Sequence, residues 1–297
     1  MSSEPFRPDL VDKPWFAAPD LRVTWKFQMP ILREGELSVD YLDDGAGPAV
    51  VLVHSSVSGN KQWRRLVEAL RPTYRCLAPN LLGYGLTSPW QAGRRQTLAD
   101  AAQVTLALCK KISGPIHLIG HSWGGAVALE TANQLGPRVS HLALYEPMLC
   151  GLLHIQGKAE AWSEALGIYT AVQRLSDAQD WAALAEVFTD YFNGDGSWAA
   201  TPAERQSVIA SQLPPNRHEW DASSQPTTAQ DFGGVTARTL ILRGSRTRLV
   251  TKEIADVLCQ AFPHWQLQEI QDAGHMGPLT HGATVNAKIQ FFLALAP

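Results

Sequence analysis

Residues 115–125 read Pro-Ile-His-Leu-Ile-Gly-His-Ser-Trp-Gly-Gly. The apolar run 115–119 predicts a buried strand, and residues 124–135 predict a helix directly after it. Between them lies a tight turn that carries Ser122, with glycine two residues before and two residues after it. A serine at such a bend adopts unusual backbone angles, and larger side chains at the flanking positions would collide. The start of the following helix directs amide groups and its positive dipole end at this point. The stretch therefore predicts that Ser122 is a nucleophile.

The bulk composition limits the kind of protein this is. The chain has 297 residues, is 45% hydrophobic and carries a net charge of −3, which allows one large core or a core with a sub-domain. No block of like charge is present, so neither nucleic acid nor a membrane surface is an expected partner. The longest apolar runs are far too short to cross a bilayer. Four scattered cysteines and an N-terminus without the features of a secretory signal predict reduced thiols and a cytoplasmic location.

The order of apolar strands and amphipathic helices predicts the organisation of the chain. Residues 1–20 contain four prolines and are expected to form an N-terminal arm, followed by a first strand at 22–29. Residues 21–149 and 236–297 alternate strands with helices, which is typical of an α/β fold with a mostly parallel sheet covered on both faces. Residues 150–235 show helical periodicity only and predict a helical lid, with a capping box at 201–204. An acidic turn at Asp40, Asp43 and Asp44 is interpreted as a solvated hairpin.

A serine hydroxyl needs a base, an acid that orients the base, and donors for the developing oxyanion. His275 is the candidate base, because it follows the last expected strand in a glycine-flanked loop. His121 and His281 are less favoured, and His121 is expected to pack beneath the bend. The backbone amides of Ser56 and Trp123 are the candidate oxyanion donors, one after the strand 49–53 and one after the nucleophile.

Four motifs together resemble the α/β-hydrolase superfamily over about residues 25–295. They are Gly-His-Ser-Trp-Gly at 120–124, the strand that ends in His-Ser-Ser at 54–56, Asn-Leu-Leu-Gly-Tyr-Gly at 80–85, and Gly-His at 274–275. The resemblance implies an eight-stranded sheet, Ser122 on the strand-to-helix bend, His275 as base, and no cofactor. A serine nucleophile argues against the chemistry of haloalkane dehalogenases and epoxide hydrolases, relatives that use aspartate at this position.

The sequence departs from the family pattern most seriously at the orienting acid. Members commonly carry Gly-x-x-Asp after the seventh strand, whereas this chain has Gly244-Ser-Arg-Thr247. Thr247 cannot hold a charge, and its replacement by alanine is expected to be nearly silent. Glu146, at the end of the strand 141–145, is the preferred candidate acid, because some members place the acid at the sixth strand. Asp272 is the second candidate. Two smaller departures are Ser55, where glycine is usual, and Asn80, where aspartate is usual.

The expected lid is rich in aromatic residues and lacks a concentration of Arg or Lys, which favours an apolar substrate. Met148, Leu149 and Met276 are candidate pocket residues. No pair of ligands has metal-binding spacing, so neither a metal nor a cofactor is expected. The sequence thus predicts a serine hydrolase acting on a small or medium apolar ester. Hydrolysis of a lactone, amide or carbon–carbon bond remains open, as does a ligand sensor with little turnover.

Overall fold

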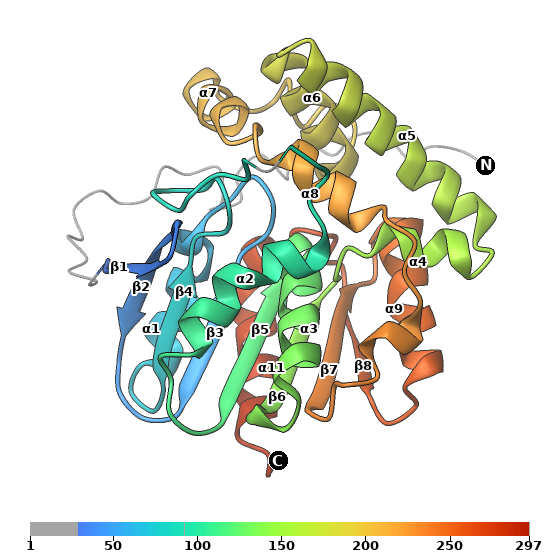
Figure 1. Cartoon of the computed structure of the whole chain (residues 1–297). Coiled ribbons are helices and arrows are strands. Elements are labelled where there is room, and N and C mark those ends of the chain that lie inside the picture. The colour runs from blue at the N-terminus through green and yellow to red at the C-terminus, as the bar shows by residue number, and fades with distance from the viewer. Residues whose placement is uncertain (1–28, 92, 297) are drawn as a thin grey trace.

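The computed structural model describes residues 29–91 and 93–296, and its central layer is one eight-stranded sheet (Figure 1). The predicted arm 1–20 and first strand 22–29 lie outside the described residues, apart from Met29. The strand order is β1-β2-β4-β3-β5-β6-β7-β8. Only β1 with β2 and β2 with β4 pair antiparallel; all other neighbours are parallel. The strands are β1 (Ile31–Glu34), β2 (Leu37–Asp44), β3 (Ala49–Val53), β4 (Arg75–Pro79), β5 (Ile116–His121), β6 (Val139–Tyr145), β7 (Arg238–Gly244) and β8 (Gln266–Ile270).

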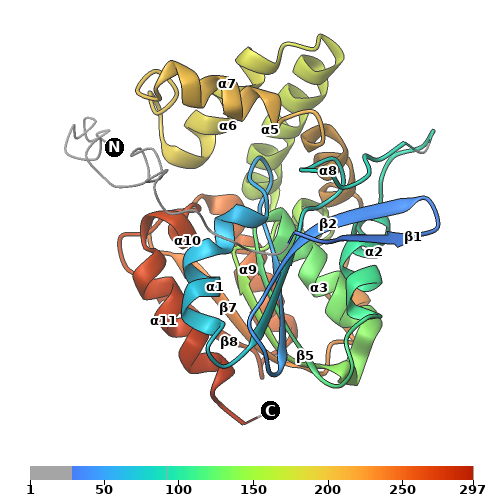
Figure 2. The same cartoon turned by 90° about the vertical axis from the view of Figure 1, so that its left-hand side faces the viewer.

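Helices cover both faces of this sheet, which confirms the predicted fold class. Helices α1 (Arg64–Leu70) and α11 (Gly282–Leu293) lie on one face, and α2 (Leu98–Cys109), α3 (Trp123–Leu135) and α9 (Leu249–Ala261) on the other (Figure 2). The central strands are buried on both faces because alternate side chains enter different cores. In β3, Val51 and Val53 pack in one hydrophobic core and Val50 and Leu52 in the other.

A series of helices follows β6 and lies over the edge where the parallel strands end (Figure 1). These helices are α4 (Cys150–Ile155), α5 (Ala159–Asp177), α6 (Trp181–Asn193), α7 (Ala203–Ser211) and α8 (Asn216–Ser223). The short η4 (Ala229–Phe232) follows them and lies beside the C-terminal end of α3, where Asn133 donates to the Asp231 carbonyl. Residues 150–235 are called the helical insert below. The chain then returns to the sheet at β7, and the short helix α10 (Gly277–Thr280) precedes α11. None of the helices in the described ranges is long and apolar enough to cross a membrane.

Two local predictions are wrong. The capping box at 201–204 does not form: α7 begins at Ala203 after Pro202, with no side-chain cap. The Thr201 hydroxyl instead donates to the carbonyl of Ser197 at 2.8 Å. Thr201 is buried, so its hydroxyl is used within the insert rather than at the helix start.

Asp40 does not belong to a solvated hairpin. It lies within β2 with 5% exposure, and its carboxylate accepts hydrogen bonds from Asn80 Nδ2 at 2.7 Å, from the Thr87 hydroxyl and from the Leu86 N–H. These contacts anchor the loop that follows β4. They also account for the asparagine at position 80, because an aspartate there would place a second carboxylate against a buried one.

Candidate active site

Ser122 lies at the bend between β5 and α3, as the sequence predicts. Its backbone angles are φ 57° and ψ −123°, a conformation that only glycine adopts without strain. The flanking glycines are needed for space: a Cβ at Gly120 would lie 2.4 Å from the Gly124 carbonyl oxygen, and one at Gly124 would lie 2.2 Å from that of His54. The neighbouring backbone therefore packs so closely around the bend that Ser122 is held in its strained conformation.

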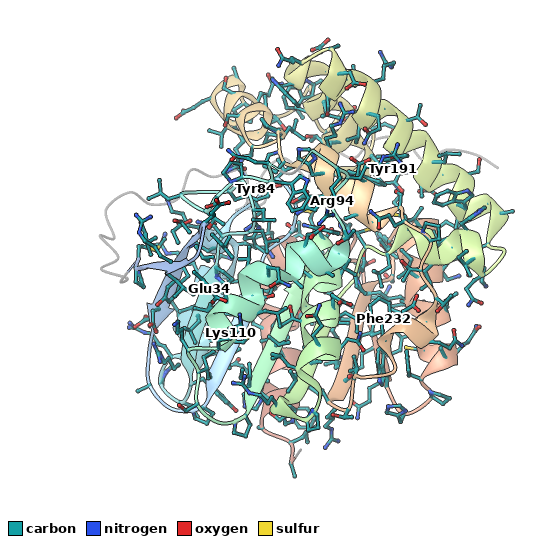
Figure 3. The ribbon with its side chains drawn as sticks, viewed as in Figure 1. Glu34, Tyr84, Arg94, Lys110, Tyr191 and Phe232 are labelled. Atoms are coloured by element: carbon teal, nitrogen blue, oxygen red, sulfur yellow. The ribbon has the colours of Figure 1, made fainter. Side chains whose placement is uncertain are left out.

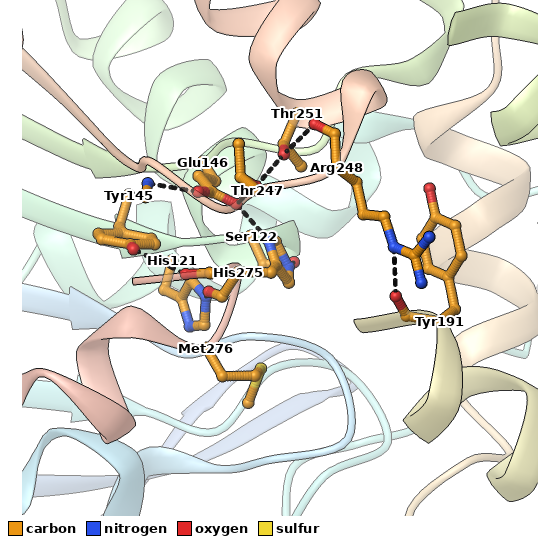
Figure 4. A network of polar contacts seen from close by, with 12 residues as sticks. His121, Ser122, Tyr145, Glu146, Tyr191, Thr247, Arg248, Thr251, His275 and Met276 are labelled. Atoms are coloured by element: carbon orange, nitrogen blue, oxygen red, sulfur yellow. Dashed lines mark hydrogen bonds and ion pairs between the residues drawn. The ribbon is translucent and has the colours of Figure 1, made fainter. Parts of the chain in front are cut away.

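Three predicted site residues form a continuous line of hydrogen bonds (Figure 4). His275 Nε2 lies 2.8 Å from Ser122 Oγ, and His275 Nδ1 lies 2.7 Å from Glu146 Oε2. The ring is 3% exposed and stacks on Phe192 of α6, with 4.4 Å between the ring centroids. In this geometry the imidazole can accept the serine proton while the carboxylate holds its Nδ1–H.

The structure shows how Glu146 reaches the histidine. It follows β6 in a left-handed conformation (φ 44°), and its side chain is fully buried. One carboxylate oxygen, Oε1, accepts the Gly244 N–H at 2.7 Å. The other, Oε2, accepts both His275 Nδ1–H and the Thr247 hydroxyl, which also lies at 2.7 Å. Three donors therefore hold the carboxylate in one orientation.

Thr247 is thus more than an uncharged residue at the usual acid position. Its hydroxyl joins Glu146 Oε2 and, at 2.6 Å, the hydroxyl of Thr251 (Figure 4). The expectation that its replacement is nearly silent is inconsistent with this contact. The other candidate acid, Asp272, is directed away from the imidazole and pairs with Arg246 at 2.7 Å, with 56% of its side chain exposed.

The two candidate oxyanion donors differ from the amides beside them. Among the described residues, neither the Ser56 N–H nor the Trp123 N–H donates a hydrogen bond. By contrast, the Ser55 N–H donates to a glutamine side chain and the Val57 N–H donates to the Tyr84 hydroxyl at 2.9 Å. Ser56 and Trp123 also line one cavity together with Ser122. Two unpaired donors therefore lie at the cavity that contains the serine.

A buried chain of polar groups joins the Ser55 loop to the His275 loop. Gln62 Oε1 accepts from the Ser55 N–H and hydroxyl at 3.1 and 2.8 Å, so its amide nitrogen faces His121 Nδ1 at 3.1 Å. His121 Nε2–H then donates to the His275 carbonyl at 2.8 Å. Burial and the neighbouring His275 lower the pKa of His121, which keeps its ring neutral. The serine at position 55, where glycine is usual, supplies two of these contacts.

Two cavities meet at Ser122. The smaller encloses about 260 Å³ and the larger about 810 Å³, both counted with the space open to solvent. Met148 lines the smaller and Met276 the larger. Leu149 lines neither, because its side chain, 2% exposed, packs in the hydrophobic core. The prediction for Leu149 is therefore wrong.

The helical insert supplies further cavity residues, none of which the sequence singled out as a site residue. Phe188 and Phe192, four residues apart on α6, line both cavities. Their helical spacing was visible, but the same spacing is typical of packing residues. Glu219 of α8 lines the smaller cavity, and no sequence pattern distinguished it from a solvated helix face.

The described residues contain neither a cluster of metal ligands nor a disulfide. Within residues 29–91 and 93–296, no group of three or more histidine, cysteine, aspartate or glutamate side chains is placed to hold a metal ion. The four cysteines are free thiols, and three of them are buried. Burial raises the pKa of Cys76, Cys109 and Cys150 to about 12, so these thiols are unreactive.

Comparison with known proteins agrees with this architecture. The model of the alpha/beta hydrolase family matches residues 50–288, and the chain belongs to that family. A 2-hydroxy-6-oxo-2,4-heptadienoate hydrolase of Pseudomonas putida is 27% identical over 248 residues, covering 81% of this chain and 87% of that protein. A pimeloyl-[acyl-carrier protein] methyl ester esterase of Methylococcus capsulatus is 28% identical over 260 residues, covering 84% and 96%. The family and these relatives support a hydrolytic activity.

A solved carboxylesterase from Bacillus subtilis has the same fold. Its TM-score is 0.71 and its identity 16%, with 91% of this chain and 93% of that chain covered. At this identity the likeness shows the fold alone. The choice of substrate therefore depends on the residues around Ser122.

Proposed function

We propose that this protein is a cofactor-independent serine hydrolase that cleaves a small to medium apolar ester through an acyl-enzyme. The observation that carries the proposal is the line Glu146–His275–Ser122, which ends at a cavity beside two unpaired backbone N–H groups. The acyl group would enter this cavity, whose walls are mainly apolar. None of the steps below requires a metal ion.

The mechanism follows from the hydrogen bonds. Ser122 Oγ attacks the ester carbonyl while His275 Nε2 takes its proton, and Glu146 stabilises the imidazolium through Nδ1–H. The Ser56 and Trp123 amides bind the oxyanion of the tetrahedral intermediate. His275 then returns the proton to the leaving alcohol. A water molecule, activated by the same imidazole, releases the acid and regenerates Ser122.

We propose that the helical insert acts as a lid over the active site. It contributes Phe192, which stacks on His275, and Phe188, which lines both cavities. Arg248, at the start of α9, holds the insert by donating to the Tyr191 carbonyl at 2.7 Å and packing over the Tyr191 ring (Figure 4). The Phe192 ring thereby covers one face of the imidazole. We propose a small-molecule substrate, with no nucleic acid or membrane partner; the cytoplasmic location remains a prediction.

The first test is active-site labelling with a fluorophosphonate. Wild type is expected to label stoichiometrically, whereas Ser122→Ala should not label and should fold normally by circular dichroism. An ester panel then measures turnover. Folded wild type that neither labels nor hydrolyses esters would contradict the proposal and favour a ligand sensor.

A second candidate function is hydrolysis of a different bond by the same residues. The relative from Pseudomonas putida favours it, because its name specifies a keto acid, not an ester. Lactones, amides and keto acids with a cleavable carbon–carbon bond belong in the same panel. Turnover of one of these at a kcat/KM well above that of every ester would select this alternative.

A further inference from the structure

The two cavities that meet at Ser122 contain different catalytic groups. Ser56 and Ser122 line both, whereas Trp123 lines only the smaller cavity and His275 only the larger. Their volumes also differ, about 260 Å³ against about 810 Å³, both counted with the space open to solvent. This asymmetry bears on which end of an ester each cavity accepts.

The proposed reaction assigns one end of the ester to each cavity. In the tetrahedral intermediate, the reacting carbon carries Ser122 Oγ, the oxyanion, the alcohol oxygen and the acyl chain. The oxyanion lies at the Ser56 and Trp123 N–H groups, and the alcohol oxygen must lie within hydrogen-bond reach of His275 Nε2, which protonates it. The alcohol chain therefore continues into the cavity that His275 lines, the larger one. The acyl chain is the remaining substituent and enters the smaller cavity.

Buried side chains bound the part of the smaller cavity that is not shared with the larger. Met148, after β6, and Trp220, on α8, are 5% and 4% exposed, and both belong to the hydrophobic core. Narrow gaps and space open to solvent make up most of the volume, so the cavity has room for about one water molecule. Because a methyl group is close in size to a water molecule, an acetyl group fits, whereas a longer acyl chain meets these walls.

Hydrogen bonds fix the backbone of Met148. Its N–H donates to the Ser122 carbonyl at 3.1 Å, and its carbonyl accepts from the Ser223 hydroxyl at 2.9 Å. Ser223 lies on α8, so this contact also ties the helix that carries Trp220 to the segment after β6. The two walls therefore cannot move apart without breaking these bonds.

A second set of contacts holds α8 against the loops of the sheet. The Glu219 carboxyl accepts from Asn216 Nδ2 at 3.2 Å and has the hydroxyls of Ser56 and Tyr84 as hydrogen-bonding neighbours. Ser56 follows β3, and Tyr84, labelled in Figure 3, lies in the loop after β4. An acyl chain that pushed α8 outward would disturb these contacts, and forcing extra methylenes into a filled space is itself unfavourable.

The larger cavity sets no comparable limit on the alcohol. Its lining extends from Met276, beside His275, to Ile209 and Arg205 of α7. Arg205 and Asn193, the last residue of α6, are both exposed, so a chain that follows this lining reaches solvent. An alcohol of several carbons therefore has room.

We propose that the protein prefers esters of a very short acyl group, foremost acetyl, with a larger alcohol, and that Met148 and Trp220 limit the length of the acyl chain. The inference rests on the proposed function and narrows its substrate class. One additional methylene in a filled apolar pocket changes kcat/KM by about tenfold or more. The acyl chain is therefore the part of the substrate that this protein discriminates.

The test measures kcat/KM for ethyl acetate, ethyl butanoate and butyl acetate in a pH-stat. Ethyl acetate is expected to exceed ethyl butanoate by about 100-fold, about tenfold for each added methylene. This quotient is called the acyl ratio below. Butyl acetate should be hydrolysed at least as well as ethyl acetate. Because butyl acetate and ethyl butanoate are isomers of nearly equal hydrophobicity, a difference between them reports the position of the ester bond.

Variants of the cavity walls test the assignment of Met148 and Trp220. Met148→Ala and Trp220→Leu each enlarge the smaller cavity and should raise kcat/KM for ethyl butanoate, so that the acyl ratio falls to about tenfold or less. Met276→Ala is the matched control, because it shortens the same kind of side chain in the larger cavity. It should leave the acyl ratio within about twofold of wild type. Circular dichroism checks that each variant folds.

The outcomes distinguish this inference from the proposed function. Equal kcat/KM for ethyl acetate and ethyl butanoate in wild type, with normal fluorophosphonate labelling, would overturn the inference and leave the hydrolase assignment intact. A preference for ethyl butanoate over butyl acetate would also overturn it, as would an acyl ratio that neither Met148→Ala nor Trp220→Leu lowers. Absent labelling and absent turnover of all three esters would instead refute the proposed function.

Discussion

Replacing Glu146 by glutamine is the most direct perturbation of the proposed machinery, and the structure predicts where the new amide group must point. Gly244 N–H donates to Oε1 and cannot rotate away, so the glutamine oxygen is expected to occupy that place. Its NH2 group then faces His275 Nδ1 and the Thr247 hydroxyl. The Thr247 hydroxyl can rotate and accept a hydrogen bond from this NH2 group. The imidazole can accept one only if its Nδ1 carries no proton.

This arrangement selects the tautomer of His275 that cannot act as the base. With its proton on Nε2, His275 donates toward Ser122 Oγ and can no longer accept the serine proton. Losing the correct tautomer and the carboxylate charge together costs a serine protease about 10⁴ in kcat. For Glu146→Gln we therefore expect a loss of about 10³ to 10⁴ in kcat/KM, equivalent to about 4–5.5 kcal/mol of transition-state stabilisation.

The assay measures ester turnover and the second-order rate of fluorophosphonate labelling. Asp272→Asn is the matched control and should keep wild-type rates, because its carboxylate is paired with Arg246 away from the ring. Adding Thr247→Asp to Glu146→Gln should recover part of the activity, since position 247 already borders the same imidazole-bound oxygen. A Glu146→Gln enzyme within tenfold of wild type would refute the assignment of Glu146 as the orienting acid.

Three further results are expected. Thr247→Val removes a hydrogen bond to a carboxylate and should lower kcat/KM about tenfold, whereas Thr247→Ser should retain it; wild-type rates in both would show that the bond does not matter. Gln62→Leu breaks the link between the Ser55 loop and His121 and should lower kcat several-fold with little change in KM; an effect confined to KM would argue against this positioning role. Burial raises the pKa of Glu219 from 4.5 to about 7, so the folded state binds the proton more tightly than the unfolded chain. The resulting stabilisation is complete below pH 4.5 and is lost as the pH rises through 7. Between pH 5 and pH 8 the free energy of urea unfolding of wild type should therefore fall by about 2.5 kcal/mol more than that of Glu219→Gln, and parallel pH profiles would contradict the shift.

The elements that the sequence predicted well depend on local rules. The bend around Ser122 could be recognised because its two glycines are required by contacts within a few residues and with the adjoining strand. The alternation of buried strands and amphipathic helices likewise specifies which segments pair and which cover them. By contrast, Asp40 was misassigned, because the loop residues that bury it lie 40 or more positions away.

In the candidate active site, too, local patterns could be predicted from the sequence, whereas long-range contacts could not. The order of the strands, together with the resemblance to the α/β-hydrolases, indicated Ser122, His275 and Glu146, because strand ends of a parallel sheet meet at one edge. The sequence did not reveal that the Thr247 hydroxyl and the Gly244 amide would complete the carboxylate, or that Leu149 would turn into the core. It also contained no sign that Glu219 would be buried at the cavity.

The sequence by itself thus determined the fold class and the identity of the candidate nucleophile and base, since backbone sterics and hydrophobic periodicity act over a few neighbouring residues. Only the tertiary structure decided the partners of Glu146 and the composition of the cavity. Those contacts join β6 with the segment after β7, about 100 positions apart, and join the insert with the loop after β3. Their geometry depends on how whole elements pack, because a side chain must be placed to within a fraction of an ångström to form a hydrogen bond.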